Sequence, residues 1–361
     1  MSETVPASGA GGRRVWGIYD ERFLRHELAG HPERPARLRH VVAELQRRSL
    51  WERVTWLPAA AASEDQLATV HDPEYVALIR EASAAGGGML DLNTYLTADS
   101  HEVACLAAGS TVGLTGTVVG ERGVGFALVR PPGHHAMPQR AMGFCLFNNI
   151  ALAAEHAGRE LGLERVAIVD WDLHHGNGTQ EAFFHRPDVL YCSIHESPKF
   201  PGTGARDEIG VWAGEGYTVN VPLRSGAADE HYLRAFDEVF APIVRAFGPQ
   251  LILVSAGYDA HMADPIGGMA LSVAGFRQMA ERVLAWADEL CEGRLVLVLE
   301  GGYDLEGLAR GVAVTFEALL GLRSAAEDRP PPLHPRLAEE LDKQLEMAKI
   351  VQRQFWCLGG A

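Results

Sequence analysis

Short apolar runs alternate with longer amphipathic stretches along most of the chain. A short apolar run predicts a strand that is buried on both faces, and an amphipathic stretch predicts a helix that covers such strands. We expect strands at 15–19, 125–129, 166–171, 189–194, 218–222, 251–256 and 295–299. We expect helices at 36–48, 73–84, 101–119, 149–161, 229–247, 273–290 and 304–320. The alternation predicts an α/β fold, a single-domain parallel β-sheet flanked by helices on both faces.

The segment VDWDLHHGNGTQ, residues 169–180, places ionisable side chains directly after one of these strands. A strand has a side-chain period of two, so Asp170, Asp172 and His174 point toward one side. Carboxylate oxygen and imidazole nitrogen suit a borderline divalent ion such as zinc. The alternative, a capped loop of hydrogen-bonded polar residues, crowds costly polar groups against the core. The segment therefore predicts half of a metal site.

Three further polar segments also follow predicted strands. Adjacent His134 and His135 stand in a turn stiffened by prolines, and paired histidines suit proton transfer near neutral pH. Asp259 is a candidate third metal ligand, with a turn or cap role as the alternative. Tyr303, beside two glycines, is a candidate donor to a developing oxyanion, with packing as the alternative. Because the carboxyl ends of parallel strands meet at one edge of a sheet, we expect these loops to share one pocket.

Charge and cysteine content narrow the class of partner. A formal net charge of −15 over 361 residues argues against nucleic acid and weakly favours cationic substrates. Five scattered cysteines without CxxC spacing indicate no disulfide framework, so we expect a cytoplasmic location. No apolar run approaches the roughly 20 residues that span a bilayer, and the N-terminus lacks the apolar core of a signal peptide. We therefore expect no membrane partner.

Seven segments follow one another along the chain: HPERP at 31–35, RPPGHHA at 130–136, MGFCLFNN at 142–149, DWDLHHGNGTQ at 170–180, FPGTG at 200–204, SAGYDA at 255–260 and EGGYD at 300–304. Together they resemble the histone deacetylase family, within the arginase–deacetylase fold. The resemblance covers about residues 15–320, and the segments occur in the family's order. The sequences HHGNGTQ and LEGGY are similar to those of class II enzymes and their bacterial relatives. Those relatives are the histone deacetylase-like amidohydrolases and the acetylpolyamine amidohydrolases.

The resemblance implies roles for the residues at the matching positions. One zinc ion per chain would be held by Asp172, His174 and Asp259. The tandem catalytic histidines would be His134 and His135, with Asp170 as partner of the first and Asn177 beside the second, and Tyr303 would bind the scissile carbonyl. A structural monovalent cation, usually potassium, would lie at Asp170, Asp172, His174, Ser193 and Ile194.

The resemblance also implies a narrow tunnel for an acylated lysine. Its walls would be Gly143, Phe144 and Phe200, since two aromatic faces can enclose a four-carbon stem and exclude water. Ile266 stands where the family's polyamine-selective class II enzyme has a Glu gatekeeper. Class IIa enzymes, whose deacetylase activity is weak, have His at the position of Tyr303, whereas this chain has Tyr. The expected activity is therefore zinc-dependent hydrolysis of acetyl-lysine to lysine and acetate. The alternatives are an amidohydrolase of acetylpolyamines or other small acylated amines, and a non-catalytic acyl-lysine binding protein.

The two ends of the chain lie outside the alternation of strands and helices predicted for its middle. Residues 1–14 predict a disordered tail, 15–322 the catalytic domain, and 323–361 a proline-rich linker followed by a helix at 336–356. The helix carries one apolar stripe, formed by Leu337, Leu341, Leu345, Ala348, Val351 and Phe355. That stripe could dock on its own domain or on a second subunit, so a homo-oligomer through this helix stays open.

Overall fold

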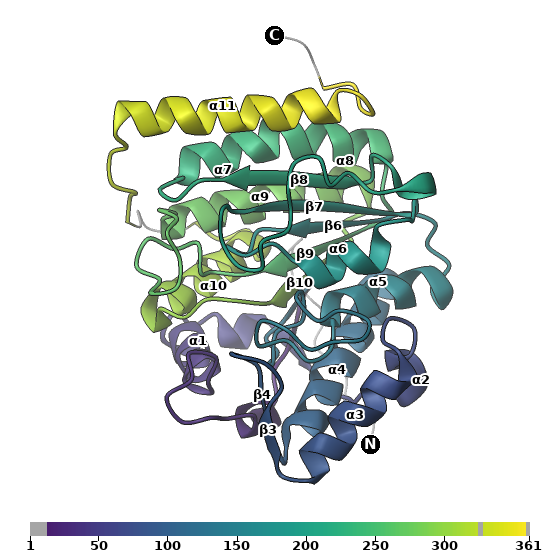
Figure 1. Cartoon of the computed structure of the whole chain (residues 1–361). Coiled ribbons are helices and arrows are strands. Elements are labelled where there is room, and N and C mark those ends of the chain that lie inside the picture. The colour runs from purple at the N-terminus through teal and green to yellow at the C-terminus, as the bar shows by residue number, and fades with distance from the viewer. Residues whose placement is uncertain (1–12, 324–327, 359–361) are drawn as a thin grey trace, which may run out of the picture.

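An eight-stranded, wholly parallel sheet runs through the middle of the computed structural model, which describes residues 13–323 and 328–358 (Figure 1). The strand order is β2-β1-β5-β10-β9-β6-β7-β8. The strands are β1 Val15–Ile18, β2 Thr55–Leu57, β5 Val124–Ala127, β6 Val166–Asp170, β7 Val189–Glu196, β8 Thr218–Leu223, β9 Leu251–Ala256 and β10 Leu295–Leu299. The predicted α/β fold is confirmed.

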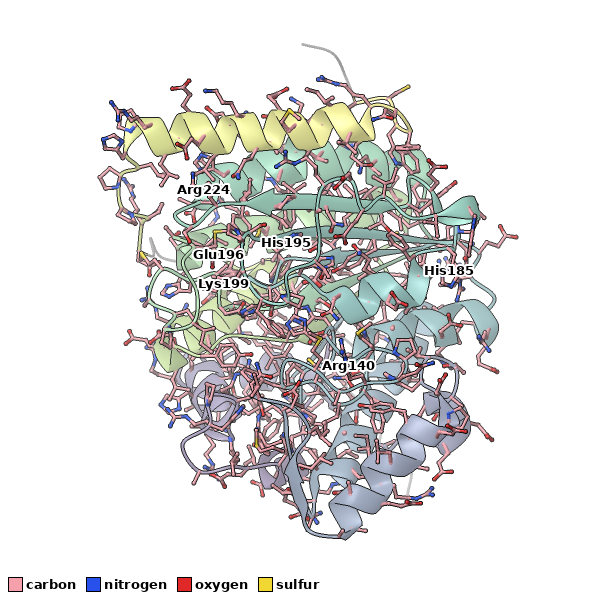
Figure 2. The ribbon with its side chains drawn as sticks, viewed as in Figure 1. Arg140, His185, His195, Glu196, Lys199 and Arg224 are labelled. Atoms are coloured by element: carbon pink, nitrogen blue, oxygen red, sulfur yellow. The ribbon has the colours of Figure 1, made fainter. Side chains whose placement is uncertain are left out.

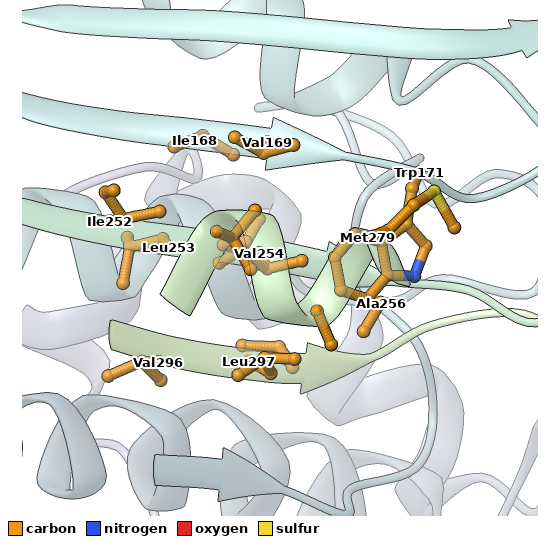
Figure 3. Close-up of a cluster of buried hydrophobic side chains, with 14 of the residues drawn as sticks. Ile168, Val169, Trp171, Ile252, Leu253, Val254, Ala256, Met279, Val296 and Leu297 are labelled. Carbon is orange, nitrogen blue, oxygen red and sulfur yellow. The ribbon is translucent and has the colours of Figure 1, made fainter. Parts of the chain in front are cut away.

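The core lies on both faces of the central strands. Figure 3 shows apolar side chains of β6, β9 and β10 stacked across the sheet, with Trp171 and Met279 closing one end. Ile168, Leu253 and Leu297 are fully buried. Burying one such side chain contributes about 1.5–3 kcal/mol, which is why these strands read as continuous apolar runs rather than alternating ones.

Two layers of helices cover the sheet (Figure 1). One face carries α4 Ser100–Glu121, α5 Asn149–Arg159 and α6 Asn177–Phe183. The other face carries α1 Ala36–Arg47, α7 Asp229–Ala235, α8 Ala241–Phe247, α9 Val273–Leu290 and α10 Leu305–Leu319. Short α2 Glu64–Leu67 and α3 Pro73–Ala84 pack near α4, beside an antiparallel hairpin of β3 Gly87–Met89 and β4 Tyr95–Thr97.

The structure differs from the sequence-based prediction at short or irregular elements. The edge strand β2 and the β3–β4 hairpin have three residues per strand, too few for a periodic signal. The predicted helix 229–247 contains a π-helical turn at Phe236–Phe240, where the Ala241 N–H donates to Phe236 O. Pro242 follows and offers no N–H, so the ordinary helical ladder is interrupted at this point.

Helix α4 corrects the expectation about apolar length. At 22 residues it is long and apolar enough to cross a membrane by length and composition, so the statement that no run approaches that length was wrong. Most of its most apolar window is buried inside the domain, with Leu106 and Leu114 at 2% and 0% exposure. A core helix against a sheet has the same composition as a membrane span, and burial accounts for the apolarity of α4.

The C-terminal helix α11, Pro335–Gln352, lies along β8 and α7 of its own chain (Figure 1). Leu341, Leu345 and Ala348 are buried there, so the apolar stripe docks on its own domain. The helix ends before the predicted 356. A homo-oligomer through this helix stays a prediction, as do the boundaries 15–322 and 323–361. The predicted tail at 1–14 falls mainly outside the described residues.

Candidate active site

The polar loops after β5, β6, β9 and β10 meet at the carboxyl edge of the sheet, as the topology requires. Asp170 ends β6, and Asp172 and His174 follow it. Asp259 comes after β9 and Tyr303 after β10. Strand order alone places these loops together, because β5, β10, β9 and β6 are consecutive neighbours in the sheet.

Asp172, His174 and Asp259 form a cluster that could hold one metal ion. One donor atom from each lies within 4.8 Å of the others, and all three residues are buried. Backbone N–H groups fix the carboxylates: Leu173 N donates to Asp259 Oδ1 at 2.9 Å, and Gly301 N donates to Asp172 Oδ2 at 2.8 Å. The donor atoms are therefore oriented before any ion arrives.

The chemistry of the cluster fits a divalent cation. Burial, and then the charge of Asp172, raise the pKa of Asp259 to about 7, because two carboxylates out of water repel each other. A bound cation would relieve that repulsion. A Cβ at Gly301 would lie 2.3 Å from Asp259 Oδ2 and 2.6 Å from Asp172 Oδ2, so this close approach requires glycine. Two carboxylates and one imidazole suit zinc with an open position for water.

The tandem histidines have different partners. His134 Nδ1 lies 3.1 Å from Asp170 Oδ2, and His135 Nδ1 lies 2.8 Å from Asn177 Oδ1. An amide oxygen can only accept, so His135 donates from Nδ1 and its Nε2 is the unprotonated nitrogen. The structure thus brings together both predicted pairs.

These partners separate the two imidazoles electrostatically. Burial opposes charge on His134, but the charges of Asp172 and Asp170 outweigh it and raise its pKa to about 10. Burial, followed by the charges of His134 and His174, holds the pKa of His135 well below its ordinary value. At neutral pH in the metal-free protein these effects favour the imidazolium form of His134 and the neutral imidazole form of His135.

Glu300, which sequence reasoning left without a role, holds the histidine turn in place. Its Oε2 accepts from Gly133 N at 2.7 Å and His134 N at 3.1 Å, and its Oε1 accepts from Ser255 Oγ at 3.2 Å. Burial raises its pKa to about 7. The only signal in the sequence was its place in EGGYD, because a buried carboxylate that binds backbone N–H groups leaves no spacing pattern.

A second unassigned group, Arg37, supports Tyr303. Its guanidinium lies 5.0 Å from the centroid of the Tyr303 ring, and its Nε donates to Gly302 O at 2.6 Å. Asp264 accepts from the Tyr303 N–H at 2.6 Å. Burial raises the pKa of Tyr303 well above its ordinary value. The Tyr303 hydroxyl therefore keeps its proton at neutral pH and can donate it.

A cavity of about 160 Å³ leads to these groups. It is lined by Asn93, His135, Gly143, Phe144, His174, Lys199, Phe200, Ile266 and Tyr303. The four tunnel residues predicted from the sequence are among them, and Asn93 and Lys199 were missed because nothing marks a rim residue in a single sequence. The Phe200 ring lies edge-on to His135 at 5.1 Å, and Phe144 edge-on to Tyr303 at 5.6 Å. Gly143 has φ +55°, and a Cβ there would lie 2.4 Å from the His135 ring.

The five residues predicted to hold a monovalent cation come from the end of β6, the loop that follows it and β7. Asp170 is opposite Ser193 in the parallel register, and Ile194 follows on β7. All five are buried. Ser193 Oγ is 2.9 Å from His195 Nδ1. The potassium site stays a prediction.

Comparison with known proteins gives consistent matches over most of the chain. A model described as the histone deacetylase domain matches residues 31–319. The histone deacetylase-like amidohydrolase of Pseudomonas aeruginosa is 40% identical over 302 residues, which cover 83% of this chain and 80% of that protein. The polyamine deacetylase HDAC10 of Homo sapiens is 38% identical over 340 residues, covering 90% of this chain and 49% of that protein. The crystal structure of the HDA15 HD domain aligns with TM-score 0.87 at 38% identity and covers 95% of both chains.

Proposed function

The chain belongs to the histone deacetylase family, and from that premise we propose that it is a zinc-dependent deacylase that hydrolyses acetyl-lysine in proteins or peptides to lysine and acetate. Family membership agrees with the resemblance drawn from the motifs and makes the chain a member of a hydrolase family. One observation carries the finer proposal: His135, His174 and Tyr303 line a single narrow cavity between two aromatic walls. That shape suits a linear acylated amine whose amide reaches the buried end.

The residues of the site divide the reaction between them. Zinc held by Asp172, His174 and Asp259 would polarise the amide carbonyl and lower the pKa of a water. The free Nε2 of His135 would accept a proton from the water that attacks the carbonyl carbon, and the Tyr303 hydroxyl would donate a hydrogen bond to the developing oxyanion. When the C–N bond breaks, the imidazolium form of His134 or His135 supplies a proton to the leaving amine. The acyl carbon keeps the oxygen of the water and leaves as acetate. His134 Nδ1 lies 3.1 Å from Asp170 Oδ2, and the charged form of His134 would stabilise negative charge beside this path.

Tyr303→Phe should keep the fold and the metal but lower kcat about 10²-fold, the range for deleting one oxyanion donor. The variant keeps the ring between Phe144 and Arg37, so only the hydroxyl is lost. Steady-state kinetics on an acetyl-lysine peptide, with metal content measured on the same preparation, is the test. Tyr75→Phe is the matched control, because its buried hydroxyl donates to Leu146 O outside the cavity. Near-normal kcat for Tyr303→Phe would return this residue to a packing role.

The alternative substrates are acetylpolyamines and other small acylated amines, and one relative is a polyamine deacetylase. Ile266 favours lysine, because it lines the cavity and offers no carboxylate to a second ammonium. A non-catalytic acyl-lysine binder would be expected to lack a ligand or the tyrosine, and all of these groups are present. Zinc content together with acetate release from an acetyl-lysine peptide tests the proposed function. A chain that binds the peptide but releases no acetate would be a binding protein. We propose a cytoplasmic location on the cysteine pattern alone.

Ile266→Glu should shift kcat/KM toward acetylspermidine relative to an acetyl-lysine peptide by roughly five- to tenfold, because a partly exposed charge pair contributes about 1 kcal/mol. The Ile266 N–H donates to Asp264 Oδ1 at 3.0 Å, which holds this side chain at the cavity. Added salt should weaken the shift. Ile266→Gln is the neutral control of the same shape. A strong preference of the wild type for acetylspermidine would overturn the lysine assignment.

A further inference from the structure

Lys199 places a positive charge at the cavity that the proposed reaction does not use. It follows β7 and precedes Phe200, the aromatic wall, and it lines the cavity with His135 and His174. Its side chain is 30% exposed, so this residue lies where the cavity meets solvent. In Figure 2, Lys199 lies close to Glu196, the last residue of β7.

Glu196 restricts where this ammonium can go. Lys199 Nζ lies 3.4 Å from Glu196 Oε2, and the Glu196 side chain is 3% exposed. The same oxygen accepts from Gly268 N at 3.0 Å, while Oε1 accepts from Ser225 Oγ. Gly268 and Ser225 fix the carboxylate of Glu196, so the ion pair favours a position of Lys199 Nζ beside Glu196. An ammonium has three N–H donors, and one contact to Glu196 leaves others for a substrate.

The surrounding charge makes Lys199 stand out. The other described lining residues are neutral side chains or histidines, and none is a carboxylate. The chain as a whole has a net charge of −15, so the positive charge of Lys199 at the cavity mouth is opposite in sign to the net charge of the protein. Near the mouth, a substrate carboxylate is attracted to Lys199 and a second substrate ammonium is repelled.

We propose that Lys199 determines specificity by selecting acyl-lysine substrates that carry a carboxylate next to the acylated lysine, and by disfavouring those with an ammonium there. This inference rests on the proposed function. The carboxylate could be an acidic side chain or a free C-terminus, which offer the same chemistry to the amine.

The test uses three acetyl-lysine peptides that differ only in the next residue, which is Asp, Asn or Lys. For the wild type, kcat/KM should be about threefold higher with Asp than with Asn and about threefold lower with Lys, as for a partly exposed charge pair. Lys199→Met should bring both ratios close to one, and Lys199→Arg should keep them. A further peptide that ends at acetyl-lysine, with a free or an amidated C-terminus, separates the two sources of carboxylate.

Arg224→Met is the matched control, because Arg224 is exposed and pairs with Glu340 on α11, away from the cavity. It should leave every ratio unchanged. Equal ratios in the wild type and Lys199→Met would overturn this inference alone, provided that the wild type hydrolyses the Asn peptide. No hydrolysis of any peptide by the zinc-loaded wild type would reject the proposed function and this inference with it.

Discussion

Asp259→Ala should abolish stoichiometric zinc binding and reduce deacetylase turnover to background. Two remaining ligands leave the charge and geometry of the ion under-supported, and even outer-sphere changes cost about 10- to 100-fold in metal affinity. The substitution should not unfold the chain. In the metal-free protein it removes one of two buried carboxylates, of which Asp259 has its pKa raised to about 7 by burial and then by the charge of Asp172. Metal analysis after dialysis, with turnover of an acetyl-lysine peptide, is the measurement.

Asp259→Asn separates charge from packing. Its amide oxygen can still accept from Leu173 N, as Asp259 Oδ1 does at 2.9 Å, but the formal charge at the metal position is lost. We expect weaker zinc binding than in the wild type together with an unchanged melting temperature of the metal-free protein, or a higher one. Full zinc occupancy and full activity in Asp259→Ala would show that this ligand has been misassigned.

His135→Ala should lower kcat about 10²- to 10⁴-fold while zinc content stays normal, because the variant lacks the general base and keeps every ligand. His156→Ala is the control, because His156 lies in the last turn of α5 and does not line the cavity, and it should leave kcat unchanged. Single-turnover kinetics on an acetyl-lysine peptide would measure the chemical step directly. A kcat within a few-fold of the wild type would assign the base to another group.

The pH profile of Asn177→Asp tests the same assignment in a second way. A carboxylate would replace the amide that now lies 2.8 Å from His135 Nδ1, and it would raise the pKa of His135. A general base must be unprotonated, so the acid limb of kcat/KM should move to higher pH. In the wild type, burial and the neighbouring imidazoles hold the pKa of His135 low. An unmoved acid limb would mean that His135 does not control it.

Much of the fold could be predicted because its central strands are buried on both faces. β9 and β10 were predicted with their observed ends, and so were α3 and α9. Boundaries failed where local rules compete, as in the π-helical turn before Pro242. The apolar helix α4 shows the limit of composition, since length and hydropathy do not distinguish a core helix from a membrane span.

The sequence by itself determined which chemistry is present. Asp170, Asp172 and His174 alternate after an apolar strand, and their residue types predict part of a metal site. The structure ends β6 at Asp170, which lies beside His134, and groups Asp172 and His174 with Asp259. The paired histidines indicate proton transfer, because an imidazole titrates near neutral pH. Tyr303 indicates oxyanion binding, because its hydroxyl can donate a hydrogen bond. These are local patterns, and a local pattern is readable without a structure.

Only the tertiary structure decided the distances and the burial at these groups. The resemblance implied Asp170 and Asn177 as the partners of His134 and His135, and the structure places each partner at hydrogen-bonding distance. The charges of Asp172 and Asp170 then raise the pKa of His134 against its burial, while burial and the neighbouring imidazoles lower that of His135. It brings Glu300 to the histidine turn across 167 residues and sets Lys199 among the residues that line the cavity, with Glu196 3.4 Å from its Nζ. Burial and long-range contact set these properties, because the desolvation and the field at a side chain depend on neighbours that lie far away in the sequence.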